Sequence, residues 1–235
     1  MSDEHFFYIS PENITQNSFS LDEVESHHAS HVLRMNAGEK IWLLDGTGVA
    51  YAGKIECKEP RVSGTINETI PNFAEPVVEM HLVVGLLKKD RFELLLEKAV
   101  ECGATSITPL LLDRCVKKSL NMERSRKIVI AAAKQCGRSR FPTLQEPISL
   151  GEWLIANQDT VVCLNIGSEE KLTDWNQIHL PKKIHIIIGP EGDFSDSENR
   201  LMKDYKIPFL SIGLRRLRAE TAAFTALNII EHGRR

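Results

Sequence analysis

The chain has 235 residues, of which 42% are hydrophobic and 26% are charged, a composition typical of a globular protein with one or two domains. No apolar run reaches the roughly 18 residues that a membrane span needs, and the N-terminus lacks the basic-then-apolar order of a signal peptide. We therefore expect a cytoplasmic protein without a membrane partner. The five cysteines are widely spaced and form no C-x-x-C pair, which argues against a disulfide framework or a zinc knuckle.

The net charge of −3 is unevenly distributed along the chain. Residues 1–70 hold 11 acidic and 5 basic side chains, whereas the remainder is net positive. Local basic clusters bind phosphate even in an acidic protein, although a solvated surface is the alternative for any one cluster. These clusters are Lys88, Lys89 and Arg91; Arg114, Lys117 and Lys118; Lys134, Arg138 and Arg140; and Arg215, Arg216 and Arg218.

Residues 1–70 predict a small β-rich domain. Residues 26–35 have the pattern of a short helix, and two strands, 40–44 and 49–57, flank the turn residues Asp45-Gly-Thr-Gly48. A further strand is expected over 62–66. The polar segment 67–76 carries two prolines and no strand or helix period, so we expect the domain boundary there.

Residues 71–235 predict alternating strands and helices. The apolar runs at 160–164 and 184–188 are typical of strands buried on both faces of a parallel sheet, and Ser195-Asp-Ser-Glu198 is a capping box that begins a helix. Such alternation predicts an α/β domain with a parallel sheet covered by helices. The other expected strands are 77–86, 106–111 and 208–212, and the other expected helices are 91–102, 121–136, 150–157 and 219–231.

Three strand ends carry the candidate chemistry, because ligands of open α/β sheets bind beyond the carboxyl ends of the strands. They are residues 163–167, 189–194 and 211–222. Neither glycine loop matches G-x-G-x-x-G or the phosphate-binding G-x-x-x-x-G-K-[ST], which argues against a dehydrogenase or a triphosphate site. Glycine backbone can instead approach a flat ligand closely.

Two segments at these ends resemble a known superfamily. GPEGDFSDSE (189–198) and SIGLRRLRAETAA (211–223) resemble the second and third motifs of the SPOUT methyltransferases. The whole chain is similar to the RsmE family within that superfamily, with supporting segments at 27–34, 87–91, 98–103 and 135–140. Two positions depart from the family pattern: Asp193 stands where glycine is usual, and Arg216 where an aliphatic residue is more common.

The resemblance implies a fold, an activity and partners. It implies a PUA-like β-barrel that binds RNA over 1–70 and a SPOUT methyltransferase domain with a C-terminal trefoil knot over 71–235. The implied enzyme is a homodimer that uses S-adenosylmethionine to methylate N3 of a uridine in 16S ribosomal RNA, in the assembled small subunit. A non-catalytic RNA-binding factor of ribosome assembly on the same fold is the alternative.

Site residues follow from the resemblance and from the chemistry it implies. Uridine N3 is a weakly acidic imide, so its proton must leave and the resulting anion must be stabilised. Expected catalytic residues are Arg138, Arg218 and Glu220. Expected cofactor-binding residues are Leu164, Gly167, Gly189, Pro190, Glu191, Gly192, Ile212, Gly213, Leu214 and Leu217. Expected RNA-binding residues are His28, Arg34, Lys88, Arg91, Arg114, Lys117 and Arg140.

Several of these residues have alternative interpretations. Arg138 is alternatively a phosphate clamp, and Glu220 a carboxylate favoured by a helix N-terminus. Cys136 as a nucleophile would methylate carbon 5, but a lone cysteine is more often inert. His27 and His31 have the i, i+4 spacing of zinc ligands but lack the glutamate of H-E-x-x-H, so no metal is expected.

Overall fold

A computed structural model describes residues 5–157 and 159–233. The chain divides into two compact units, one formed by residues 1–75 with 130–141, the other by residues 76–129 with 142–235. Each has its own six-stranded sheet. Within the described residues no helix is long and apolar enough to span a bilayer.

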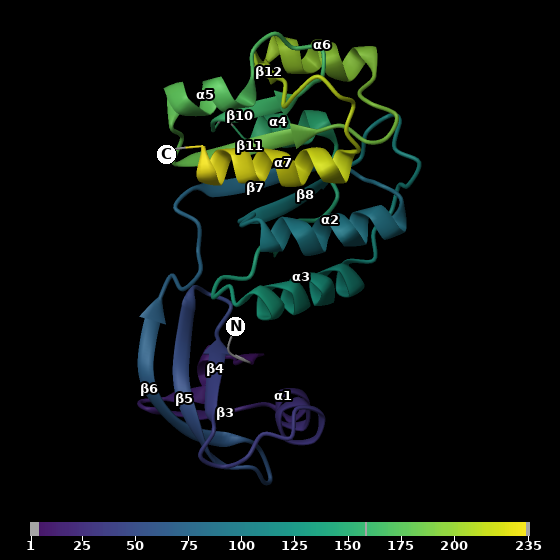
Figure 1. Cartoon of the computed structure of the whole chain (residues 1–235). Coiled ribbons are helices and arrows are strands. Elements are labelled where there is room, and N and C mark those ends of the chain that lie inside the picture. Colours follow the sequence, from purple (N-terminus) through teal and green to yellow (C-terminus); the bar gives the residue numbers. More distant parts are fainter. Residues whose placement is uncertain (1–4, 158, 234–235) are drawn as a thin grey trace. The chain divides into compact units, whose positions relative to one another are not determined.

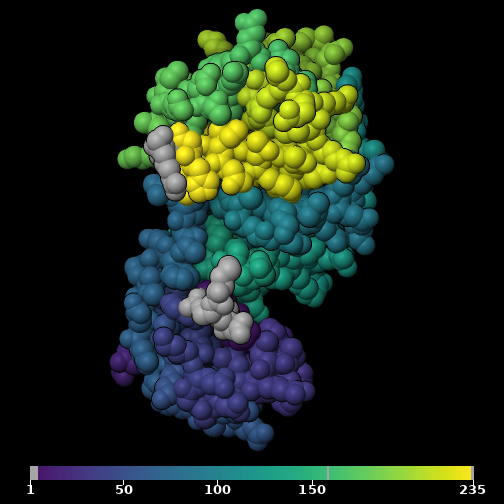
Figure 2. Space-filling view, viewed as in Figure 1, coloured from purple at the N-terminus to yellow at the C-terminus, as the bar shows by residue number. Residues whose placement is uncertain are grey.

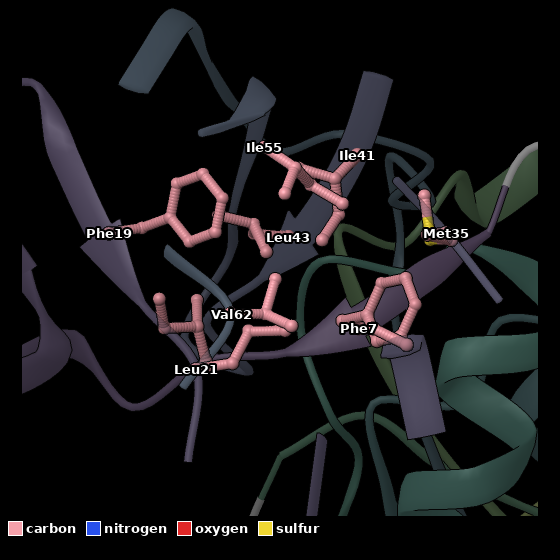
Figure 3. Packing of buried hydrophobic residues seen from close by; sticks show 10 residues of the cluster. Phe7, Phe19, Leu21, Met35, Ile41, Leu43, Ile55 and Val62 are labelled. Atoms are coloured by element: carbon pink, nitrogen blue, oxygen red, sulfur yellow. The ribbon is translucent and has the colours of Figure 1, made fainter. Parts of the chain in front are cut away.

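The first unit is a curled, mainly antiparallel sheet with strand order β1-β4-β5-β6-β3-β2. Alternating side chains from its strands point inward and form a core with Phe7, Phe19 and Leu43 (Figure 3). Its elements are β1 (Phe6–Tyr8), β2 (Ile14–Thr15), β3 (Ser18–Ser20), α1 (Glu23–His27), a π-helical turn (His28–Val32), β4 (Lys40–Leu44), β5 (Val49–Cys57) and β6 (Ser63–Pro71), with a short 3₁₀ turn at Pro11–Asn13.

The expected strands 40–44 and 49–57 and the turn between them are confirmed as a β-hairpin. β4 and β5 pair antiparallel, and Asp45 Oδ1 accepts hydrogen bonds from the backbone N–H groups of Thr47, Gly48 and Val49. The segment 67–76, in which we expected the boundary, contains the junction of the two units between Glu75 and Pro76, but its first half forms a strand rather than a loop. β6 continues to Pro71 because its backbone pairs with β5 as far as Val49, and this pairing holds a polar sequence in an extended conformation.

The second unit is a parallel sheet with strand order β12-β10-β11-β7-β8-β9 (Figure 1). The prediction of a parallel α/β sheet is therefore confirmed. Its strands are β7 (Glu79–Gly85), β8 (Ser106–Leu110), β9 (Thr143–Leu144), β10 (Val161–Leu164), β11 (Lys183–Ile188) and β12 (Phe209–Leu210). Its helices are α2 (Lys89–Glu101), α4 (Leu150–Ala156), α5 (Leu172–His179), α6 (Asp196–Asp204), α7 (Ala219–His232) and the first half of α3 (Met122–Cys136).

Helices bury the sheet, which explains the continuous apolar runs of its strands. Ile184, Ile186 and Ile187 of β11 are fully buried. α2 and α7 lie side by side, and Figure 2 shows α7, in yellow, at the surface of this unit. The capping box predicted at Ser195 is present: its hydroxyl accepts from the backbone of Glu198, and the Glu198 carboxylate accepts from the backbone of Ser195.

Candidate active site

Three adjacent strands of the parallel sheet end at the same edge and build one cavity. β12, β10 and β11 are neighbours, so the loops that follow them converge. With the first turns of α7 and α2 they enclose about 360 Å³, which is within the range of small-molecule sites. The lining residues are Arg91, Leu164, Asn165, Ile166, Ile188, Gly189, Pro190, Glu191, Asp193, Ile212, Gly213, Arg215, Arg216, Leu217, Arg218, Ala219 and Ala222.

The loop after β11 is fixed by close backbone packing and by polar contacts. A Cβ atom on Gly85, at the end of β7, would lie 2.8 Å from the backbone nitrogen of Pro190, so glycine is needed for this approach. Glu191 Oε1 accepts from the Lys88 backbone N–H at 3.4 Å and lies 3.9 Å from Arg91 Nη1. These contacts hold the glutamate against the start of α2.

Asp193 in the same loop has a φ of +64°. This left-handed region favours glycine, but aspartate tolerates it because the short side chain bonds locally. Its Oδ1 accepts from the Phe194 backbone N–H at 2.9 Å. Asp193 therefore adopts the turn conformation that glycine would favour here, and it adds a carboxylate to the cavity.

The loop after β12 brings cations to the mouth of the cavity. Gly213 has a φ of +141°, and a Cβ there would meet no atom within 4 Å, so this backbone is openly accessible. Arg215, Arg216 and Arg218 are exposed. With Arg91 they set four positive charges against the two carboxylates, Glu191 and Asp193. Such a field favours an anionic substrate near the mouth.

Cys163 lies in β10, next to the cavity-lining Leu164. Burial, with a smaller contribution from the charge of Asp193, raises the pKa of the Cys163 thiol far above its ordinary value. A thiol in this state is not a nucleophile. The cavity therefore offers backbone, apolar surface, carboxylates and guanidinium groups to a ligand.

The structure brings seven of the ten expected cofactor-binding residues to this cavity and places three elsewhere. Gly167 lines a neighbouring polar hollow with Arg200 and Lys203 of α6. The Gly192 carbonyl accepts from Arg114 Nη1 at 3.1 Å, and Leu214 is 99% exposed. The seven in the lining are Leu164, Gly189, Pro190, Glu191, Ile212, Gly213 and Leu217.

The three expected catalytic residues lie in different surroundings. Arg218 lines the cavity as the residue that precedes α7. Glu220 is buried in the first turn of α7, and its Oε2 has no hydrogen-bond partner within the described residues. Arg138 belongs to the first unit, where Nη2 donates to Glu75 Oε2 at 2.7 Å and both side chains are buried.

The expected RNA-binding residues are divided between the units. In the first, the ring of His28 packs 5.7 Å from that of Phe7, Arg34 is exposed, and the Arg140 backbone N–H donates to Glu75. In the second, Arg91 lines the main cavity and Lys117 lines a smaller one. Lys88 and Arg114 are exposed beside the loop after β11.

Some lining residues were not expected in this role. They include Asn165, Ile166, Ile188, Asp193, Arg215, Arg216, Ala219 and Ala222. All but Ile188 lie in the same three segments as the expected residues, and Ile188 is the last residue of β11, directly before the second segment. These residues are therefore predictable when each strand end is considered as a whole. Arg91 is different, because only the fold carries α2 to the cavity. No group of three metal-ligating side chains is found among residues 5–157 and 159–233.

Comparisons with known proteins agree with this architecture. Residues 74–231 match the family described as RNA methyltransferase domain, and residues 21–57 match the RNA methyltransferase PUA domain. The chain is 31% identical to ribosomal RNA small subunit methyltransferase E of Synechocystis over 93% of its own length and 74% of that protein. It is 30% identical to the same enzyme of Rickettsia conorii, over 86% and 84%.

Solved structures agree along nearly the whole chain. The Neisseria gonorrhoeae ribosomal RNA small subunit methyltransferase E, solved with S-adenosyl methionine, has a TM-score of 0.86 and 29% identity and covers 95% of both chains. A Legionella pneumophila putative methyltransferase, solved with the same cofactor, has a TM-score of 0.85 and 31% identity over 97% and 96%. From its two matched domains and its full-length relatives, this chain belongs to the ribosomal RNA small subunit methyltransferase E (RsmE) family of RNA methyltransferases.

Proposed function

We propose that this protein transfers a methyl group from S-adenosylmethionine to N3 of a uridine in 16S ribosomal RNA of the small subunit. The observation that supports this proposal most directly is the cavity at the ends of β10, β11 and β12. It lies in a chain whose full-length relatives are named as small-subunit rRNA methyltransferases, and whose structural neighbours contain that cofactor.

The lining of the cavity fits this cofactor. Backbone at Gly189 and Gly213 is accessible to a flat adenine ring, and Leu164, Ile212 and Leu217 supply apolar contacts. Glu191 and Asp193 supply negative charge for the cationic sulfonium and ammonium groups. When bound, the cofactor supplies an electrophilic methyl group on sulfur.

The residues near α7 fit the needs of the acceptor. During transfer the N3–H bond breaks, the new N3–methyl bond forms, and the sulfur–methyl bond breaks. Arg218 at the cavity would stabilise the anionic imide, and Glu220, buried two residues later in the first turn of α7, would accept the N3 proton. S-adenosylhomocysteine, methylated uridine and a proton are the balanced products.

Labelled donor and small subunits lacking the modification test this proposal. Label should appear at N3 of one 16S uridine. Arg218→Ala should lower kcat by about 100-fold, the scale of losing one preorganised stabilising group, with donor affinity nearly unchanged. Arg126→Ala, an exposed α3 residue paired with Glu146, is the control. Label at carbon 5 or on ribose would overturn the proposed chemistry.

Calorimetry separates the enzyme from the non-catalytic assembly factor. Uptake of S-adenosylmethionine by the pure protein is expected for the enzyme, and no uptake would favour the assembly factor. The family resemblance also leads us to propose a homodimer. Sedimentation measurements should then give twice the 26.5 kDa chain mass.

A further inference from the structure

A second, smaller cavity of about 160 Å³ lies in the parallel-sheet unit at the start of α2. Its floor is apolar and contains the fully buried Leu86, Leu87 and Phe92. Sites for drug-sized ligands begin at about 300 Å³, so this space suits a single ring system. The remaining lining residues are Lys89, Glu93, Lys117, Ser119, Leu120, Asn121, Arg124 and Ser125.

The rim of this small cavity is positively charged. Arg124 donates to both carboxylate oxygens of Glu93, at 2.7 and 2.8 Å. These hydrogen bonds, with the charges of Arg124, Lys89 and Lys117, hold the pKa of Glu93 below its ordinary value. Within the described residues neither lysine forms an ion pair of its own. Three cations against two carboxylates, Glu93 and the nearby Asp90, leave a net positive charge that attracts an anion.

One helical turn connects the small cavity to the cofactor cavity. In the first turn of α2, Arg91 lines the cofactor cavity and contacts Glu191. Lys89 and Phe92, on either side of it in sequence, line the small cavity. A helical turn rises about 5 Å, so neighbouring nucleotides of one RNA strand can reach both cavities.

We infer that the small cavity binds one unstacked nucleotide beside the methylated uridine, with its base against the partly exposed Leu120 of the apolar lining and its phosphate at Lys89 and Lys117. Single-stranded RNA is commonly bound in this way, by apolar or aromatic contact with an extruded base and cationic contact with the backbone. The inference rests on the proposed function, because it assigns a substrate subsite to the same reaction.

Charge reversal at the rim is the first test. Lys117→Glu should raise the KM for small subunits about tenfold and leave donor affinity, measured by calorimetry, unchanged. It should also reduce the slope of log affinity against log salt by about one, the loss of one phosphate contact. Lys127→Glu is the matched control, since Lys127 is an exposed α3 lysine outside both cavities. Equal effects of the two reversals would overturn the inference.

Removal of single bases from the RNA tests the apolar floor. Reconstituted subunits carry an abasic site at each position flanking the target uridine in turn. Wild-type protein should lose about tenfold in affinity at one of these positions, and Lys117→Glu should show a smaller loss there. No sensitivity at any position would overturn the base-binding assignment. Methylation of the unaltered subunit by wild-type protein is measured in parallel, and only its absence counts against the proposed function itself.

Discussion

Asp193 shows how one side chain can replace the glycine that the family resemblance implies at its position. The sequence identified the substitution but not its consequence, since the backbone conformation follows from the turn after β11. There, a φ of +64° is compatible with aspartate because the carboxylate accepts the next backbone N–H. The same carboxylate lines the cofactor cavity. It therefore adds a negative charge to the cavity lining, which glycine cannot do.

Asp193→Asn tests this role at the scale of one residue. Asparagine tolerates the left-handed backbone and keeps an acceptor for Phe194, so only the charge is removed. Affinity for S-adenosylmethionine should fall about three- to fivefold, roughly 1 kcal/mol for a solvent-screened charge. Affinity for S-adenosylhomocysteine, which lacks the sulfonium charge, should fall less. Equal loss for both ligands in calorimetry would show that Asp193 does not interact with the sulfonium.

Arg138 was expected to be catalytic, and that role stays a prediction. The sequence did not predict its ion pair with Glu75, because the two residues are 63 positions apart. Removing one member of a buried ion pair costs about 3 kcal/mol, so Arg138→Ala should lower the free energy of unfolding of the first unit by that order. Glu75→Gln is the matched variant. Turnover at a temperature where both variants stay folded separates the roles: loss in Arg138→Ala alone supports catalysis, whereas retention in both supports a structural pair.

Most helices and strands were predictable because their local signals agree with their tertiary setting. β11 has an unbroken apolar run, and α6 begins at a capping box. The elements that were missed lack such signals. α5 begins at Leu172, and its N-cap residue Lys171 makes no side-chain capping bond. β1, β2, β3 and β9 are two or three residues long. Their conformation is fixed by partner strands, and the trefoil knot stays a prediction of the family resemblance.

Two capping boxes in one chain allow a controlled comparison of helix starts. Ser149 precedes α4 and Ser195 precedes α6, and both form the reciprocal backbone contacts of a capping box. The two hydroxyls differ in the group to which they donate, since Ser149 Oγ donates to Glu152 Oε2 of its own helix at 2.6 Å. Ser195 Oγ also donates to Asp113 Oδ2 at 2.7 Å, and Glu198 Oε1 accepts from the Asp113 backbone N–H. Ser149→Ala should lower the free energy of unfolding by about 1 kcal/mol, and Ser195→Ala by about 1 kcal/mol more.

Denaturant titration of both variants measures this difference. If the extra loss in Ser195→Ala comes from the tie to Asp113, it should disappear when both serine variants are compared in an Asp113→Ala background. An extra loss that persists there would assign it to the helix start alone. Because α6 follows the loop that carries Gly189 and Glu191, Ser195→Ala should also weaken donor binding.

Alternating elements were enough to predict the parallel sheet of the whole second unit, and the rule for strand ends located its cavity. Strand order was not predictable, because β12 and β10 are joined across 44 intervening residues. For the same reason the sequence did not reveal that His81 and His185 face each other. They pair in register on β7 and β11, and their rings stack at 4.5 Å.

This histidine pair, in which His185 is buried and His81 is half-buried, predicts how the stability of the sheet unit depends on pH. Burial, and then the proximity of His81, lowers the pKa of His185 to about 4, and burial also lowers the pKa of His81. Between pH 6.5 and 4 the unfolded chain binds more protons than the folded one. Stability is therefore complete above pH 6.5 and falls as the pH drops, by at most about 1.4 kcal/mol per pH unit for each imidazole.

His185→Gln removes one of these two titrating groups. The free energy of unfolding of this variant should therefore fall less steeply between pH 6.5 and 4 than that of the wild type, whatever its value at pH 7. Denaturant unfolding at several pH values, followed by tryptophan fluorescence to which Trp153 beside His185 contributes, measures the slope. His179→Gln, on the exposed side of α5, should keep the wild-type slope. If His185 stays neutral in the folded state, stability must fall as the unfolded chain takes up a proton at this position. An unchanged slope in His185→Gln would therefore assign the acid sensitivity to other groups.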